Sequence, residues 1–213
     1  MIETFVIAFT IGAFFGVLFM GSAATVMLPA IESRRKHYFI AFYVLVSFFI
    51  IVCCGDYFTY EKPQYVLIGK TIVFLEYLLP SLIFVLMTRH LLFQCGKEIK
   101  KSKLFYTVTA LWVFYFVLLI IAQFTDTMYV VTPENSFERG PLHTLLLLPL
   151  LAIMTLNISA LFIYRKALNK RTFKHFLFYL FPTEIALILH PFFNTMIFVI
   201  VAVFFCAVTL FTV

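Results

Sequence analysis

Charged residues are scarce in this chain of 213 residues. Asp, Glu, Lys and Arg together make up 12% of the sequence and hydrophobic residues make up 63%, a balance far from that of a soluble domain. Charge is largely absent from residues 4–31, 38–55, 71–93, 104–125, 142–164 and 176–213. Because about 20 mostly apolar residues span a bilayer as a helix, the sequence excludes a soluble globular protein and predicts an integral membrane protein in contact with lipid.

The sequence also lacks the patterns that mark cofactor sites and catalytic sites. Its four cysteines, Cys53, Cys54, Cys95 and Cys206, show neither a metal-ligand spacing nor a disulfide framework. It contains no nucleophile-elbow, zinc-protease or phosphate-binding glycine motif. We therefore expect no cofactor, no metal site and no catalytic residue in this chain.

Basic residues are missing at both ends of the chain. A secretory signal peptide begins with a positive segment, but residues 1–4 contain no side-chain cation, so the first apolar stretch is predicted to remain as a membrane helix. No basic residue follows the last stretch. Either the protein is naturally minimal or a cytoplasmic segment normally follows Val213, and we favour the second interpretation.

The last apolar stretch is long enough for two membrane helices. It is interrupted at residues 190–194, where Pro191 disfavours helix at the residue before it. We place the sixth span near residues 176–189 and the seventh near residues 193–213. Since the loops are too short to hold a soluble domain, the sequence predicts one all-α domain, a bundle of seven transmembrane helices.

Lys and Arg gather in alternate loops of this predicted bundle. Twelve of them follow the first, third and fifth spans: Arg34, Arg35, Lys36, Lys97, Lys100, Lys101, Lys103, Arg165, Lys166, Lys170, Arg171 and Lys174. Only Lys62, Lys70 and Arg139 lie in the other loops. Because short cytoplasmic loops are enriched in Lys and Arg, we predict that the N-terminus is outside and the C-terminus is cytoplasmic. The net charge of +6 therefore reports topology, and we expect no nucleic-acid partner.

Two carboxylates lie inside the predicted spans. Glu76 is in the third span, about one-third of the way in from the outer face, and Glu184 is near the middle of the sixth. An ionisable group at membrane depth is costly, so it normally faces the bundle interior, a partner or water. Pro80 and Pro182 lie close to them and favour local bends. We expect both carboxylates to line one cavity that opens to the outside.

Three further residues lie near the outer ends of these spans or in the adjoining loop: His190, Lys70 and Arg139. Together with Glu76 and Glu184 they are our candidate ligand-binding residues, with the cations meeting an anionic group of the ligand and the carboxylates a cationic one. The alternative is that they satisfy one another or contact lipid headgroups. Lys70 in particular has a long side chain that can reach the interface.

Several local patterns in the second half of the chain resemble those of a known family. They are the segment 137–142, Phe-Glu-Arg-Gly-Pro-Leu, then the basic loop at 164–168, then Leu-Phe-Pro at 180–182. These features resemble the N-terminal seven-helix membrane region of bacterial signalling proteins that carry diguanylate cyclase (GGDEF) or phosphodiesterase (EAL) domains. His190 stands before Pro191 where that family often has glutamine. The resemblance implies a receptor-like input module joined by its last helix to a cytoplasmic output domain, with a homodimer as the assembly.

The leading functional hypothesis is therefore a sensory input module in the inner membrane, which responds to a small-molecule or membrane cue and transmits it through the last helix. The chain itself contains no GGDEF sequence and is not expected to be an enzyme. The alternative is a small transporter or permease-like protein, which the intramembrane Glu184 and the proline-interrupted helices favour. Against it are the odd number of spans and the lack of visible repeat symmetry.

Overall fold

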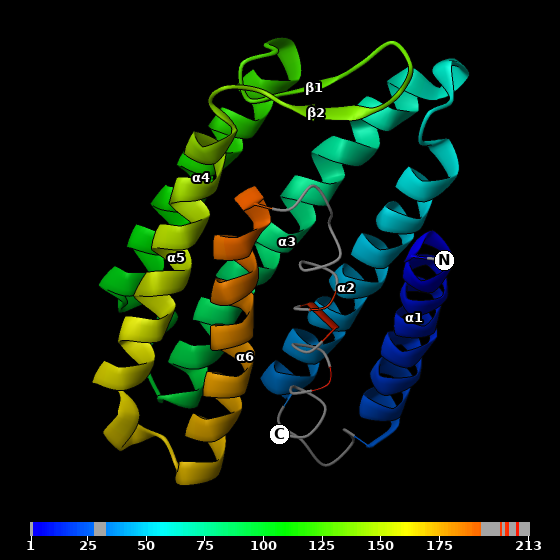
Figure 1. Ribbon diagram of the computed structural model, residues 1–213. Coiled ribbons are helices and arrows are strands. Elements are labelled where there is room, and N and C mark those ends of the chain that lie inside the picture. The colour runs from blue at the N-terminus through cyan, green and yellow to red at the C-terminus, as the bar shows by residue number, and fades with distance from the viewer. Residues whose placement is uncertain (1, 28–32, 193–200, 202, 205–207, 209–213) are drawn as a thin grey trace.

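The computed structural model describes residues 2–27, 33–192, 201, 203, 204 and 208. Helices that run alternately up and down form a bundle (Figure 1). They are α1 (Ile2–Met27), α2 (Ser33–Thr59), α3 (Val66–Gln94), α4 (Lys103–Phe124), α5 (His143–Ile163) and α6 (Lys170–Leu189). Short 3-10 helices occupy Pro63–Tyr65, Ile99–Lys101, Arg165–Ala167 and His190–Phe192.

Helices α2 to α6 are long and apolar enough to cross a membrane, so the prediction of a multi-pass membrane protein is confirmed in this form. In α1 the structure describes the side chains of a shorter apolar segment only, Ala8–Ala23. The predicted seventh span, residues 193–213, lies largely outside the described residues. The predicted end of the sixth span is confirmed, because α6 stops at Leu189, two residues before Pro191.

Local sequence signals set several helix ends. At the start of α4 the Ser102 hydroxyl accepts a hydrogen bond from the Phe105 amide, and at the start of α6 the Asn169 side chain accepts one from the Thr172 amide. Such caps satisfy amides that have no partner within the helix. Inside the helices, α3 continues through Pro80 and α6 through Pro182, so neither proline ends its helix.

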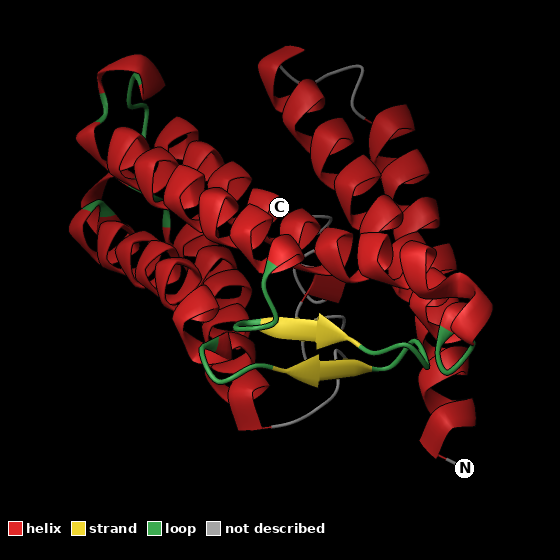
Figure 2. Cartoon of the chain, turned by 90° about the horizontal axis from the view of Figure 1, so that it is seen from above, coloured by secondary structure: helices red, strands yellow, loops and turns green. Residues whose placement is uncertain are grey.

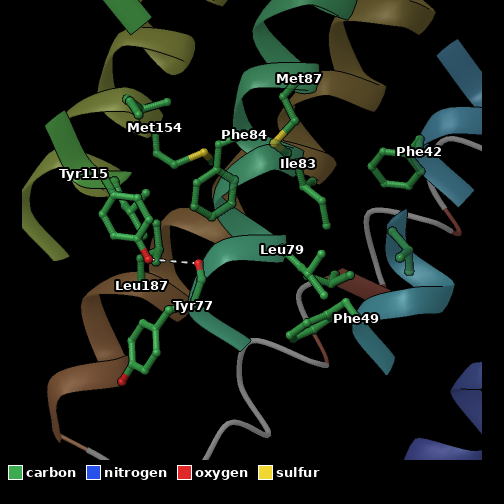
Figure 3. Packing of buried hydrophobic residues seen from close by; sticks show 14 of the residues in the cluster. Phe42, Phe49, Tyr77, Leu79, Ile83, Phe84, Met87, Tyr115, Met154 and Leu187 are labelled. Atoms are coloured by element: carbon green, nitrogen blue, oxygen red, sulfur yellow. Dashed lines mark hydrogen bonds between the residues drawn. The ribbon is translucent and has the colours of Figure 1, made fainter. Parts of the chain in front are cut away.

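Helix α3 forms the centre of the bundle and contacts α2, α4 and α5. Its side chains pack against aromatic and aliphatic residues from every neighbouring helix (Figure 3). The Tyr115 hydroxyl of α4 donates a hydrogen bond of 2.9 Å to the Tyr77 carbonyl of α3. By contrast, few residues of α4 are buried, as expected for a helix that faces lipid. Packing and such hydrogen bonds hold helices together where no hydrophobic effect operates between them.

A buried amide joins α3 to α5. The Thr88 hydroxyl donates a hydrogen bond of 2.7 Å to Asn157 Oδ1, and Asn157 Nδ2 donates one of 3.4 Å to the Phe84 carbonyl. We expect Asn157→Ala to lower the free energy of unfolding by about 1 kcal/mol, the usual size of an interhelical hydrogen bond in a membrane. Thermal unfolding in detergent measures this loss of stability. The matched control is Ser159→Ala on the exposed side of α5, and equal stability of the two variants would contradict the prediction.

The prediction of an all-α fold is corrected at one place. Two short strands, β1 (Tyr129–Val131) and β2 (Phe137–Arg139), form an antiparallel hairpin in which Tyr129 pairs with Arg139 and Val131 with Phe137. From the sequence this segment looks like a loop, because three residues are too few to display the alternation of a strand. The hairpin lies across one end of the bundle (Figures 1 and 2), which we call the hairpin end.

The tip of the hairpin is fastened to the connection between α2 and α3. Asn135, at φ 63°, donates a hydrogen bond from Nδ2 to the Thr59 carbonyl, and its own carbonyl accepts one of 3.2 Å from the Glu61 amide. Its side chain lies directly against Gly69, where a Cβ atom would overlap Asn135 Oδ1. The hairpin thus ties the α4–α5 side of the bundle to the α2–α3 side.

Candidate functional site

Polar and aromatic side chains from four separate elements meet beneath the hairpin. They are Tyr77 of α3, Arg139 of β2, His143 at the start of α5 and His190 just after α6. We call these four residues the hairpin-end cluster. The chain can turn tightly into α5 because Gly140 lies against the Thr127 carbonyl, a position where a Cβ atom would clash. This turn places His143 beside the other three residues.

The geometry of the cluster is close. Tyr77 Oη lies 3.5 Å from His143 Nε2, and the ring centroids of His143 and His190 are 5.9 Å apart. Arg139 Nη2 donates a hydrogen bond of 2.8 Å to the His190 carbonyl. The cluster therefore connects the hairpin directly to the residue that follows α6.

Aromatic rings enclose these polar groups. Tyr129 of β1 stacks on Tyr77 with ring centroids 5.6 Å apart and an angle of 6° between the planes. Phe137 of β2 contacts both Tyr77 and His143 edge-on or tilted. Tyr129 is buried, and burial raises its pKa above its usual value. The surroundings of the cluster thus exclude water from most of its sides.

His190 is the most unusual member of the cluster. Its side chain is only 3% exposed, and neither ring nitrogen has a hydrogen-bond partner among the described residues. Burial, and after it the Arg139 guanidinium and the neighbouring His143, lower the pKa of His190 to about 4. The imidazole is therefore neutral at pH 7. Buried polar atoms without partners are costly and uncommon, and perturbed titratable groups gather at functional sites.

Glu76 lies in the central helix α3 but faces a different neighbour. It is 5% exposed and makes a side-chain hydrogen bond with Cys53 of α2, while Asp56 of α2 is close enough to act on it electrostatically. Its partners are thus in the α2–α3 interface. The sequence did not single out Asp56 as a neighbour, because its distance to Glu76 depends on how the two helices pack.

Glu184 lies in the interface of α5 and α6. Its Oε1 accepts a hydrogen bond of 3.1 Å from the Thr155 hydroxyl, whereas its Oε2 is buried with no hydrogen-bond partner among the described residues. The described contacts of Glu76 and Glu184 are therefore with different helices. They do not bring the two carboxylates together, and the expectation of one shared cavity gains no support from them.

Of the five residues proposed from sequence, only Arg139 and His190 are joined by a described contact. Lys70 is exposed, and its backbone carbonyl accepts a hydrogen bond of 3.4 Å from Gln123. Sequence reasoning missed Tyr77 and His143. A histidine two residues after the Gly-Pro pair at 140–141 was the available signal for His143.

Two other features of the described part of the chain bear on what it could bind. No group of three or more His, Cys, Asp or Glu side chains there is placed to hold a metal ion. An open groove of about 450 Å³ lies between residues 41–48 of α2 and 82–86 of α3, and all its lining residues are apolar. This groove suits a lipid chain or another helix better than a polar ligand.

Comparison of the chain with models of protein families, with curated proteins and with solved structures found no match.

Proposed function

We propose that the chain is a membrane-embedded sensory input module, in which the hairpin-end cluster receives a cue and passes it to α6 and the chain beyond it. The observation that carries the proposal is the contact between Arg139 and the His190 carbonyl. Because His190 directly follows α6, a ligand that changes this contact also changes how the end of α6 is held. A cue can shift an equilibrium only by binding two arrangements with different affinity.

The proposal includes the orientation and the partners expected for such a module. The hairpin end faces outwards and the basic loops face the cytoplasm of a bacterial cell, with a seventh span leading to an output domain such as a diguanylate cyclase. The module works as a homodimer in the inner membrane and has no catalytic activity of its own. The uneven distribution of Lys and Arg supports this orientation, and the resemblance at residues 137–142 supports the kind of output.

A reporter fusion tests this function. A diguanylate cyclase domain is joined after Val213, and cyclic di-GMP is measured together with the amount of protein in the membrane. We expect Arg139→Gln to change the output about fivefold or more at unchanged abundance, which corresponds to a coupling free energy of about 1–3 kcal/mol. Lys70→Gln removes a cation at the same end but outside the cluster, and should leave the output unchanged.

Two outcomes would count against the sensory function. One is an output that stays the same in Arg139→Gln and in His190→Gln while both proteins reach normal abundance. The other is an equal change in Lys70→Gln, which would mean that charge at this end of the bundle acts without the cluster.

A small transporter is the second candidate, and one observation favours it. Glu184 lies at mid-depth with one buried carboxylate oxygen that lacks a hydrogen-bond partner in the described part of the chain, and intramembrane carboxylates often mark ion or proton pathways. Proteoliposomes report proton flux directly. Proton flux in the wild type that is lost in Glu184→Gln would favour the transporter. The sensor would be favoured if the wild type shows no flux and Glu184→Gln alters the output of the cyclase fusion.

A further inference from the structure

We infer that the hairpin-end cluster binds a small anionic group, a carboxylate or a phosphate, held by Arg139, His143 and His190. This inference names the ligand class of the site on which the proposed sensory function rests. The donors in the cluster suit such a group. A neutral imidazole offers one N–H group, a guanidinium offers several in a fork that matches a carboxylate or phosphate, and a tyrosine offers a hydroxyl.

The His190 ring is the first argument for a ligand. A side chain that is 3% exposed has little access to water, yet neither of its nitrogens has a partner among the described residues. An imidazole needs one acceptor and one donor to satisfy both nitrogens when it is neutral. A carboxylate or phosphate beside the ring would accept the N–H group, and after protonation of the ring it would meet a second N–H group and a positive charge.

The local charge decides between an anion and a cation. The titratable groups that act on His190 are Arg139 from β2 and His143 from α5, and Arg139 also acts on His143. A cation placed between the two imidazoles would therefore be repelled by the guanidinium. The nearby carboxylate of Glu76 is engaged with Cys53 on the α2 side of α3, so it is not placed to offset that repulsion.

The enclosure of the cluster strengthens such binding. Tyr129 is 3% exposed and stacks on Tyr77 beneath the hairpin, so the anionic group would lie where water and salt screen charges weakly. Electrostatic attraction is several-fold stronger in such surroundings than in bulk water. The same anionic chemistry is present in free metabolites and in the headgroups of anionic lipids, and the experiment has to separate these two sources.

The experiment uses the full chain in maltoside micelles, which contain no phosphate, with its histidines labelled with ¹⁵N. The titration of His190 is followed by NMR and assigned by comparison with His190→Gln. The probes are sodium acetate, inorganic phosphate and phosphatidylglycerol, each compared with sodium chloride at equal ionic strength. An anion beside the ring favours its charged form, so we expect at least one probe to raise the pKa of His190 from about 4 by about one unit.

Variants show whether the effect belongs to this site. Arg139→Gln should weaken binding of the active probe at least about tenfold, and Arg139→Lys should restore part of it because the positive charge returns. His37→Gln removes a histidine near the start of α2 and should bind like the wild type. Thermal unfolding of Arg139→Gln that matches the wild type ensures that its loss of binding is not simply misfolding.

Each outcome has a defined meaning. A response to acetate or phosphate supports a soluble ligand, and a response to phosphatidylglycerol alone supports a lipid headgroup. No response to any probe, or an equal response in Arg139→Gln, overturns the anion site. Suppose that an anion binds but the output of the cyclase fusion is the same in the wild type, in Arg139→Gln and in His190→Gln; the anion site then stands and the sensory function is refuted. An output that these substitutions alter, without any anion binding, would support the sensory function and refute the anion site.

Discussion

Replacing Gly69 by alanine is expected to displace the hairpin from the α2–α3 connection and to lower the free energy of unfolding by about 1–3 kcal/mol, the usual cost of overpacking a tight contact. A Cβ at this position would overlap Asn135 Oδ1. The Asn135 side chain cannot simply turn away, because it is 5% exposed and is held by the Thr59 carbonyl. The whole tip of the hairpin therefore has to move.

The measurement combines thermal unfolding with limited proteolysis of the hairpin. Gly12→Ala is the matched control, since a Cβ there would meet no atom within 4 Å, and alanine favours helix over glycine. We expect Gly12→Ala to leave stability unchanged or slightly higher and the hairpin protected. Faster cleavage at the hairpin in Gly69→Ala alone would identify the contact with Asn135 as the cause.

A double variant makes this prediction sharper. Asn135→Gly removes the overlapping side chain and keeps a residue that accepts the positive φ of this position. Its effect should be strongly non-additive with that of Gly69→Ala, as expected for residues in direct contact. If the destabilisation of Gly69→Ala is the same with and without Asn135, the proposed overlap is wrong.

The second large effect concerns the orientation of the chain in the membrane. Single cysteines are introduced at Glu134 in the hairpin turn and at Lys166 in the loop between α5 and α6, both exposed. In intact cells a membrane-impermeant maleimide should label the Glu134→Cys chain about tenfold more than the Lys166→Cys chain, because loops rich in Lys and Arg stay in the cytoplasm. After permeabilisation both should be labelled equally.

The unsubstituted chain gives the background from its own cysteines. Cys53 is buried, and Cys95 is buried near the basic loops, where burial raises the pKa of its thiol and slows its reaction with the maleimide. The orientation would be reversed if Lys166→Cys were labelled in intact cells and Glu134→Cys were not. In that case the hairpin-end cluster would face the cytoplasm, and a soluble ligand would have to come from inside the cell.

The sequence predicted the helices well because their signals are local. Runs of apolar residues marked α2 to α6, and Pro191 marked the end of α6, since a proline restricts the residue before it whatever the surrounding fold. The main differences are at helix ends. For example, α2 continues to Thr59, several residues beyond the apolar stretch that predicts it, because a helix can extend past the apolar region without breaking its hydrogen-bond pattern.

The candidate site could be predicted only in part. Arg139 and His190 were singled out from sequence, and they are joined in the structure by a hydrogen bond from a side chain to a carbonyl. Tyr77 and His143 were missed, because an aromatic residue or a histidine in an apolar helix looks the same whether it faces lipid, the core or a polar cluster. Only the rotation of each helix in the bundle separates these cases.

The sequence by itself thus determined that this protein enters a membrane and where most of its helices run, because both depend on the transfer of contiguous apolar segments out of water. The tertiary structure decided the rest. It showed that the hairpin crosses the end of the bundle and is fastened through Asn135 and Gly69, and that His143 and His190 meet beside Arg139. These contacts join residues far apart in the chain, and which of them form depends on packing between helices that no local pattern encodes.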